Sequence, residues 1–117
     1  MELINVTNQT QIASRVQIAD TFWRRLVGLL DREKMAPGEA LVIRPCQGVH
    51  TCFMRFPIDV VFLDDTNRIV HLITGMPPWR FSPVVREARA VVELPAGTIE
   101  QLGLRKGHVL RLLGRII

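Results

Sequence analysis

Short apolar segments separated by turn residues make up most of the chain. The run Ile58–Leu63 is apolar except at Asp59, and it predicts a buried strand. The side chains of Val49–Met54 alternate as they would on a second strand. The first 18 residues predict extended segments around a polar turn at Thr7–Thr10. Further strands are predicted at Ala40–Ile43, Arg68–Thr74, Ala90–Leu94 and Val109–Leu113.

Two segments have helical features. Apolar residues recur at helical spacing from Phe22 to Leu30, and Asp20 can cap the first turn of such a helix. Thr98 is predicted to cap a short helix that ends near Leu102. The prolines in Gly75–Arg80 exclude regular structure there. These elements predict a mainly β fold, a compact single-domain β barrel or sandwich of seven or eight short strands with one or two short helices, spanning residues 1–117.

The composition agrees with one ordinary globular domain. The chain has 117 residues, of which 48% are hydrophobic and 22% charged, and this excludes disorder and a disulfide-stapled miniprotein. No apolar run approaches the roughly 18 residues of a transmembrane helix, so we expect no membrane association. Met1–Asn5 has neither the basic start nor the apolar stretch of a signal peptide, and a cytoplasmic location is therefore expected.

The chain is basic, with 15 basic and 11 acidic residues and a formal net charge of +4. Thirteen of the basic residues are arginines, whose guanidinium groups match phosphate geometry. They are scattered along the sequence, however, and Arg24–Arg25 is the one adjacent pair. Codon bias accounts for such a surplus equally well. We therefore expect no sequence-specific nucleic-acid binding, and any affinity should be non-specific and lost at physiological salt.

One long segment is distinctive as a whole: Pro45–Asp64, with the sequence PCQGVHTCFMRFPIDVVFLD. It resembles the central motif of the domain of unknown function 192 family, also called uncharacterised protein family 0127. Three further pieces fit that family in order, namely Arg24–Leu30, Pro78–Arg80 and Glu93–Thr98. The resemblance extends from about residue 18 to residue 112. It implies a β-rich single domain and no established activity.

The chain departs from this family just before its last predicted strand. Gly107–His108 stands where members commonly carry Gly-Asp. If an acid at that position did chemistry in the family, this protein lacks it. We therefore assign no functional role to His108.

Four residues with soft ligand atoms share one sequence parity: Cys46, His50, Cys52 and Met54. On one strand they would project from the same face and suit zinc or cuprous copper. Successive same-face residues lie about 7 Å apart, whereas metal ligands must converge to about 2.1–2.3 Å from the metal. The alternative is that both cysteines are small buried hydrophobes. We expect no metal and no other cofactor.

A Cys-His nucleophile pair is the catalytic alternative for the same residues. Cys46 follows Pro45 in a predicted loop and is the better placed of the two cysteines for exposure. Neither cysteine, however, lies at a strand-to-helix turn or in the local signature of a known cysteine hydrolase. The catalytic residues, if there are any, stay unassigned.

Asp59 is the most informative polar residue because it interrupts an apolar run. Burying an unpaired carboxylate costs several kcal/mol, so Asp59 needs a partner. The candidates are Arg55 four residues before it, His50 across the bend at residues 56–57, and Arg80 from the proline-containing loop. One interpretation is a structural network that pins this loop to the sheet.

The functional interpretation is a pocket for a small polar or anionic ligand. Trp79 and Phe56 would form its walls, and Arg80 and His50 would orient the ligand. The predicted ligand-binding residues are His50, Thr51, Arg55, Asp59, Trp79 and Arg80.

Three functions remain open. The first is a non-enzymatic binding or accessory module with a polar site around His50, Asp59 and Arg80. The second is an enzyme that uses His50 and Asp59 for proton transfer on a small polar substrate. The third is a nucleic-acid-binding regulator. A pocket over both His50 and Asp59 would favour the enzyme, a flat basic face the regulator, and an exposed apolar patch a protein partner, which the sequence does not identify.

Overall fold

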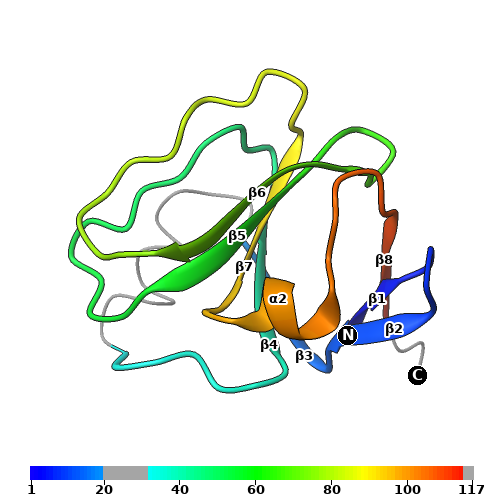
Figure 1. The fold of residues 1–117 in the computed structure, drawn as a ribbon, viewed down its shortest axis with the longest axis horizontal. Coiled ribbons are helices and arrows are strands. Elements are labelled where there is room, and N and C mark those ends of the chain that lie inside the picture. Colours follow the sequence, from blue (N-terminus) through cyan, green and yellow to red (C-terminus); the bar gives the residue numbers. More distant parts are fainter. Residues whose placement is uncertain (20–31, 115–117) are drawn as a thin grey trace.

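A computed structural model describes residues 1–19 and 32–114 (Figure 1). Among these residues it contains eight strands and one short helix, and no helix long and apolar enough to cross a membrane. The elements are β1 (Glu2–Asn5), β2 (Thr10–Ala13), β3 (Arg15–Ala19), β4 (Glu39–Ile43), β5 (Ile58–Leu63), β6 (Ile69–Met76), β7 (Ala90–Pro95), α2 (Thr98–Leu102) and β8 (Leu110–Leu113).

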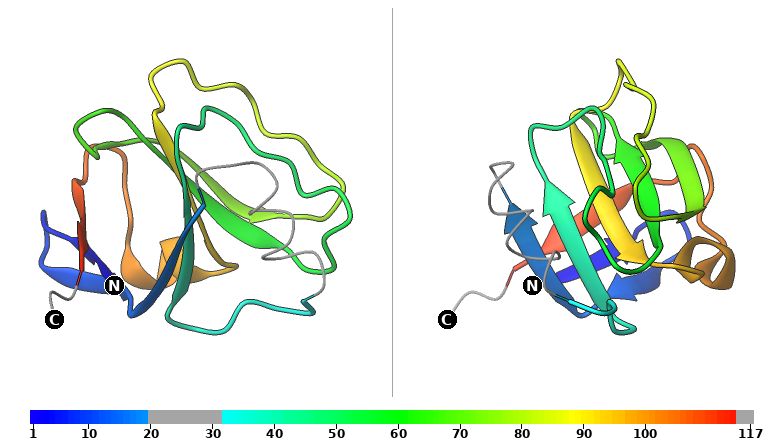
Figure 2. Two further views of the ribbon diagram at one scale, coloured as in Figure 1. Left: turned by 180° about the vertical axis from the view of Figure 1, so that it is seen from behind. Right: turned by 90° about the vertical axis from the view of Figure 1, so that its left-hand side faces the viewer.

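The strands form two sheets. The smaller has the order β2-β1-β8, and the larger has the order β3-β4-β7-β5-β6. All neighbours are antiparallel except β3 and β4, which run parallel. The smaller sheet lies on one side of the larger sheet, and the two do not close into a barrel (Figures 1 and 2). The mainly β prediction is confirmed, in its sandwich-like form.

The central strand β5 explains why one run of the sequence is almost entirely apolar. All six of its side chains are buried, because both faces of the larger sheet are covered. Val61 and Leu63 point into a first core, and alternate residues such as Val60 and Phe62 point into a second.

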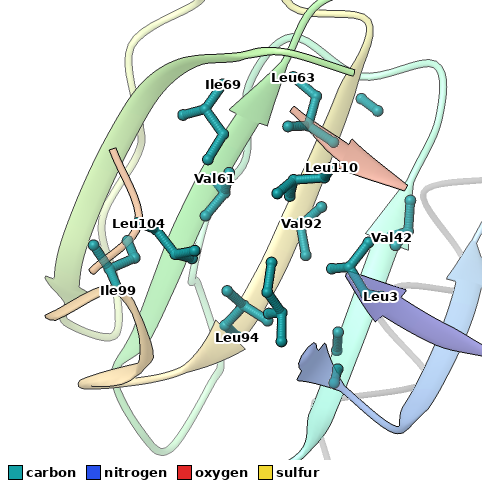
Figure 3. Packing of buried hydrophobic residues seen from close by; sticks show 14 residues of the cluster. Leu3, Val42, Val61, Leu63, Ile69, Val92, Leu94, Ile99, Leu104 and Leu110 are labelled. Atoms are coloured by element: carbon teal, nitrogen blue, oxygen red, sulfur yellow. The ribbon is translucent and has the colours of Figure 1, made fainter. Parts of the chain in front are cut away.

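The first core lies between the larger sheet, the smaller sheet and α2 (Figure 3). Leu3 from β1 and Leu110 from β8 pack there with residues of β4, β5 and β7. Ile99 and Leu104 close the same core from α2 and the segment after it.

The second core is covered by loops. The connection between β4 and β5, residues 44–57, contributes Val49, Met54 and Phe56 to this core. The connection between β6 and β7, residues 77–89, contributes Ala88 and the partly buried Val85. Both connections lie on the side of the larger sheet away from β1, β2 and β8 (Figures 1 and 2). Their buried residues therefore fix the loops against the sheet.

The structure confirms most predicted elements and corrects three. Gly75 and Met76, predicted to lie outside regular structure, are the last two residues of β6, and only the segment from Pro77 onward leaves the sheet. Residues 49–54 are a loop, in which His50 alone forms an isolated bridge, to Phe81. Thr98 is the first residue of α2 and not its cap, because Gly97 precedes the helix and the Thr98 hydroxyl donates to the carbonyl of Pro95. The helix predicted from Asp20 to Leu30 lies outside the described residues.

Asp59 is fully buried, as predicted, but its partners are not the predicted cations. Its Oδ1 accepts a hydrogen bond from the backbone N–H of Gly75, at 2.8 Å. Its Oδ2 accepts from the backbone N–H of Ile99, also at 2.8 Å. The expectation of pairing with Arg55, His50 or Arg80 is wrong, since two peptide donors satisfy the carboxylate. Asp59 thus caps α2 from a neighbouring strand and ties it to the end of β6.

His108 is the other residue that joins separate elements. Its Nδ1 accepts from the N–H of Arg105 at 3.3 Å, and it lies 2.9 Å from Nδ2 of Asn5 on β1. Asn5 is itself fully buried, and its Oδ1 accepts from the N–H of Thr7. Because a backbone N–H can only donate, Nδ1 must be the unprotonated nitrogen of the ring. An aspartate oxygen at this position could accept the same two hydrogen bonds.

We predict that Asp59→Ala strongly destabilises the fold. It leaves two buried N–H donors without an acceptor, at roughly 1–3 kcal/mol each, or about 2–6 kcal/mol together. Asp59→Asn should recover only part of this loss, because its NH₂ group faces one of the two donors. The exposed Asp65, in the turn after β5, supplies the matched control: Asp65→Ala should change the free energy by less than about 0.5 kcal/mol. Urea denaturation measures the free energy of unfolding of all three variants. Equal losses for Asp59→Ala and Asp65→Ala would contradict a stabilising role for the hydrogen bonds of Asp59 to Gly75 and Ile99.

We also predict that His108→Asp retains the stability of the parent protein, whereas His108→Ala loses about 1–3 kcal/mol. The aspartate supplies an acceptor for Asn5 and Arg105, and alanine supplies none. Thermal unfolding near neutral pH distinguishes the variants. Equal losses in both would show that the imidazole ring is needed for its packing and not for its acceptor nitrogen.

Candidate functional site

Thr51 joins the two loops that cover the second core. It is fully buried, and its hydroxyl donates to the carbonyl of Pro77 at 2.5 Å. The same oxygen accepts from the backbone N–H of Arg80 at 3.0 Å. The Thr51 N–H donates to the carbonyl of Arg80 at 2.9 Å. One small polar residue therefore fixes both ends of the turn from Pro77 to Arg80.

Backbone hydrogen bonds extend this junction on both sides. The N–H of Trp79 donates to the carbonyl of Thr51 at 3.0 Å, and the N–H of Ser82 donates to the carbonyl of Val49 at 2.9 Å. The Ser82 hydroxyl accepts from the N–H of Val49. Residues 49–55 and 77–82 thus form one unit, called the paired loops below.

The paired loops carry three exposed aromatic side chains, called the aromatic surface below. Phe53 is 64% exposed, Trp79 56% and Phe81 77%. The rings of Phe53 and Trp79 pack at a tilt, with their centroids 4.5 Å apart. The ring of Phe81 lies 5.8 Å from that of His50. Among the described residues, these are the only exposed phenylalanine and tryptophan side chains. Exposed rings on two loops that are tied together are typical of a binding surface.

The backbone at two of these rings is strained. Phe53 has a φ of 68° and Trp79 a φ of 64°, in the left-handed region that bulky residues rarely adopt. Each such residue costs of order 1–3 kcal/mol and persists where the surroundings impose it. Here the hydrogen bonds of Thr51 and the buried Met54 next to Phe53 impose it. The strained positions hold their rings in solvent, where they contribute little to the core.

The surroundings of the aromatic surface are cationic. Arg55 and Arg80 are exposed on the paired loops, and residues 44–58 and 77–86 contain no acidic side chain. Within the described part of the chain, neither guanidinium forms an ion pair. Arg80 instead donates to the carbonyl of Trp79, at 3.3 Å. Both arginines are therefore available to an anionic group.

The four residues with soft ligand atoms do not lie on one strand. Because residues 49–54 are not a strand, Cys46, His50, Cys52 and Met54 do not share one strand face, and Met54 is buried in the second core. His50 Nδ1 accepts from the N–H of Cys52, at 3.2 Å, and the Cys46 thiol donates to the carbonyl of Gly48. Among residues 1–19 and 32–114, no three His, Cys, Asp or Glu side chains cluster closely enough to hold a metal.

Four of the predicted site residues lie together on the paired loops: His50, Thr51, Trp79 and Arg80. Arg55 lies at the exposed end of the same loop. Asp59 points the other way, toward α2 and the end of β6. Phe56, predicted as a pocket wall, is buried in the second core.

Phe53 and Phe81 belong to the candidate site and were not predicted from the sequence. The alternating pattern treated Phe53 as one more strand residue, and Phe81 follows Trp79 and Arg80 without a motif of its own. The aromatic-arginine-aromatic order of Trp79–Phe81, directly after two prolines, is the one sequence signal that could have led to Phe81.

The fold occurs in two solved structures. A protein of unknown function from Novosphingobium aromaticivorans superposes with a TM-score of 0.80 at 18% identity, over 95% of this chain and 82% of that one. A putative transcription regulator from Sinorhizobium meliloti superposes with a TM-score of 0.75 at 24% identity, over 94% and 89%. At these identities the likeness establishes the fold alone.

Sequence relatives establish the family. The UPF0127 protein of Pyrococcus furiosus is 38% identical over 111 residues, which cover 90% of this chain and 92% of the relative. A UPF0127 protein of Thermococcus sibiricus is 34% identical over 90% of this chain and 70% of its own length. The model of the DUF192 family, described as Uncharacterized ACR, matches residues 4–112. The resemblance inferred from the motifs is confirmed, and the chain belongs to the DUF192 family.

Proposed function

We propose that this protein is a non-enzymatic binding module whose paired loops hold a ligand with a planar ring and an anionic group. The observation that carries the proposal is the aromatic surface: three rings more than half exposed, two of them on left-handed backbone. Backbone strain at bulky residues clusters at functional sites.

The arginines near the rings indicate that the ligand also carries an anionic group. Arg55 and Arg80 flank the rings and have no acidic neighbour in either loop segment. A guanidinium group pairs with carboxylate or phosphate through two parallel hydrogen bonds. A planar ring stacks on Phe53 or Trp79, and its anionic substituent meets an arginine.

The alternative function, an enzyme that uses His50 and Asp59 for proton transfer, is not supported at Asp59. A general base must reach the substrate, but Asp59 is fully buried and both of its oxygens accept backbone hydrogen bonds. His50 alone remains on the paired loops, and its Nδ1 is occupied by the N–H of Cys52. This arrangement favours binding over proton transfer.

We predict that adenosine monophosphate, as a probe with both a ring and a phosphate, binds at the paired loops. In ¹⁵N-resolved NMR titrations it should produce saturable shifts at residues 50–55 and 79–82. Ribose 5-phosphate lacks the ring and adenosine lacks the charge, so each should bind more weakly. Phe53→Gly should weaken the binding of the monophosphate while relieving the left-handed strain at that position.

Two results would contradict the proposal. One is a set of shifts that do not saturate and are equal for the three probes. The other is saturable binding whose shifts lie outside the paired loops. The control is Leu113→Ala on β8, which shortens an exposed apolar side chain in the smaller sheet and should leave the titration unchanged.

A further prediction concerns the preorganisation of the paired loops. Thr51→Val keeps the shape of the side chain and removes its hydroxyl, which leaves the carbonyl of Pro77 and the N–H of Arg80 without this partner. Amide hydrogen exchange at Trp79 and Ser82 should become faster, relative to the amides of β7. Thr51→Ser should behave like the parent protein, as should Thr74→Val at an exposed position of β6. Unchanged protection in Thr51→Val would show that the hydroxyl does not organise the loops.

A further inference from the structure

The aromatic surface offers more than one stacking platform. Phe53 packs with Trp79 and His50 packs with Phe81, so the rings form two tilted pairs. Both pairs belong to the same unit, because Trp79 and Phe81 are two residues apart and both loops are tied through Thr51. One small planar ligand needs one platform. Two platforms on one unit suit a ligand with successive planar groups.

Exposed arginines occur close to these rings in the sequence. Arg80 lies between Trp79 and Phe81 in the chain, and Arg55 follows Phe53 by two residues. Arg44 and Arg86 are also exposed, on the more distant parts of the two connections. A ligand that repeats a planar ring and an anion along its length complements this order of rings and cations.

We propose that the paired loops bind single-stranded nucleic acid without sequence preference, an inference that rests on the proposed function and names its ligand class. Every base presents a π-face to an aromatic ring, and the phosphates meet the arginines. Segments 44–58 and 77–86 contain no acidic residue, and the acidic residues that follow them are the buried Asp59 and the exposed Glu87.

The geometry favours a single strand over a duplex. Bases in a duplex stack on one another and cannot present their faces to protein rings. A duplex is read by a helix or a strand ribbon inserted into its major groove. Among the described residues the one helix, α2, has five residues and packs its Ile99 into the first core. The paired loops instead expose ring edges and faces, which suit unstacked bases.

An acidic peptide would use the same arginines and leave the rings without a matching partner. The three aromatic side chains are on average more than half exposed and form a large apolar surface. Carboxylates would not contact this surface favourably. The observations therefore favour nucleic acid, and an acidic polypeptide becomes an arm of the test.

The test is fluorescence anisotropy of the full-length protein with a labelled oligothymidylate of about twelve nucleotides. A duplex of the same length, adenosine monophosphate and polyglutamate serve as competitors. The oligothymidylate should bind more tightly than the duplex, and it should outcompete the monophosphate at equal nucleotide concentration. Binding should weaken as salt rises. Stacking on the rings should nevertheless leave a residual affinity at about 150 mM salt, in contrast to the loss of affinity expected from the scattered arginines alone.

Variants separate the rings from the charges. Phe53→Gly and Phe81→Ala should each weaken binding by about five- to one-hundred-fold. Arg80→Ala should lower the slope of log affinity against log salt concentration by about 0.7. Leu113→Ala and Arg111→Ala, both exposed on β8, are the matched controls and should change neither quantity.

The outcomes distinguish this inference from the function on which it rests. Saturable binding of the monophosphate at the paired loops, without tighter binding of the oligonucleotide, overturns the inference and leaves the binding module standing. Failure of both ligands overturns both proposals. Equal or tighter binding of the duplex or of polyglutamate also overturns the inference, as do aromatic variants that bind like the parent protein.

Discussion

All six side chains of β5 are withdrawn from water, and the remaining structure depends on covering the two faces on which they lie. The smaller sheet and α2 cover one face with their own apolar side chains. The other face is covered by the connections on either side of β5 and β6, through Val49, Met54, Phe56 and Ala88. A loop whose side chains cover a hydrophobic core is held more firmly than an ordinary surface loop, because its displacement would expose that core to water. This makes the second face a stable base for the candidate site.

The sequence revealed the elements whose burial is uniform. Ile58–Leu63 has the bounds of β5 because both faces are buried, and the turn after it follows from Asp64, whose Oδ1 accepts from the N–H groups of Thr66 and Arg68. The prediction from the sequence was wrong where alternating burial arose in a loop and not in a paired strand. Val49 and Thr51 are buried at alternate positions, but the left-handed residue Phe53 shifts the phase and buries Met54. Periodicity cannot distinguish a strand from a loop that is anchored at alternate residues.

The same distinction applies to the polar residues. The apolar neighbours of Asp59 were sufficient to predict its burial, since a strand that is apolar on both faces has no side open to water. They were not sufficient to predict its partners. The donors are the peptide N–H groups of Gly75 and Ile99, 16 and 40 residues away in the chain. Every residue except proline has such a group, so the sequence does not show which ones meet Asp59, whereas a cationic side chain can be recognised by its residue type. His50, Thr51, Trp79 and Arg80 do lie on the same paired loops, because the hydrogen bonds of Thr51 join the two motifs that contain them. Phe53 and Phe81 were missed because exposure depends on the direction of the loop backbone.

Asp59 and Thr51 fix two successive parts of the segment that carries Trp79. Asp59 holds Gly75 near the end of β6, where the chain leaves the sheet for residues 77–82. Thr51 then holds that segment at Pro77 and Arg80, and the left-handed residue Trp79 lies between these two attachments. A tryptophan fixed in this way has little freedom to fold back onto the protein, although doing so would bury its ring. The conformational cost of presenting the ring is therefore met by folding and not by binding. A ligand that stacks on a ring already in place loses less of its binding free energy to ordering the protein, which is the physical advantage of retaining strain at an exposed surface.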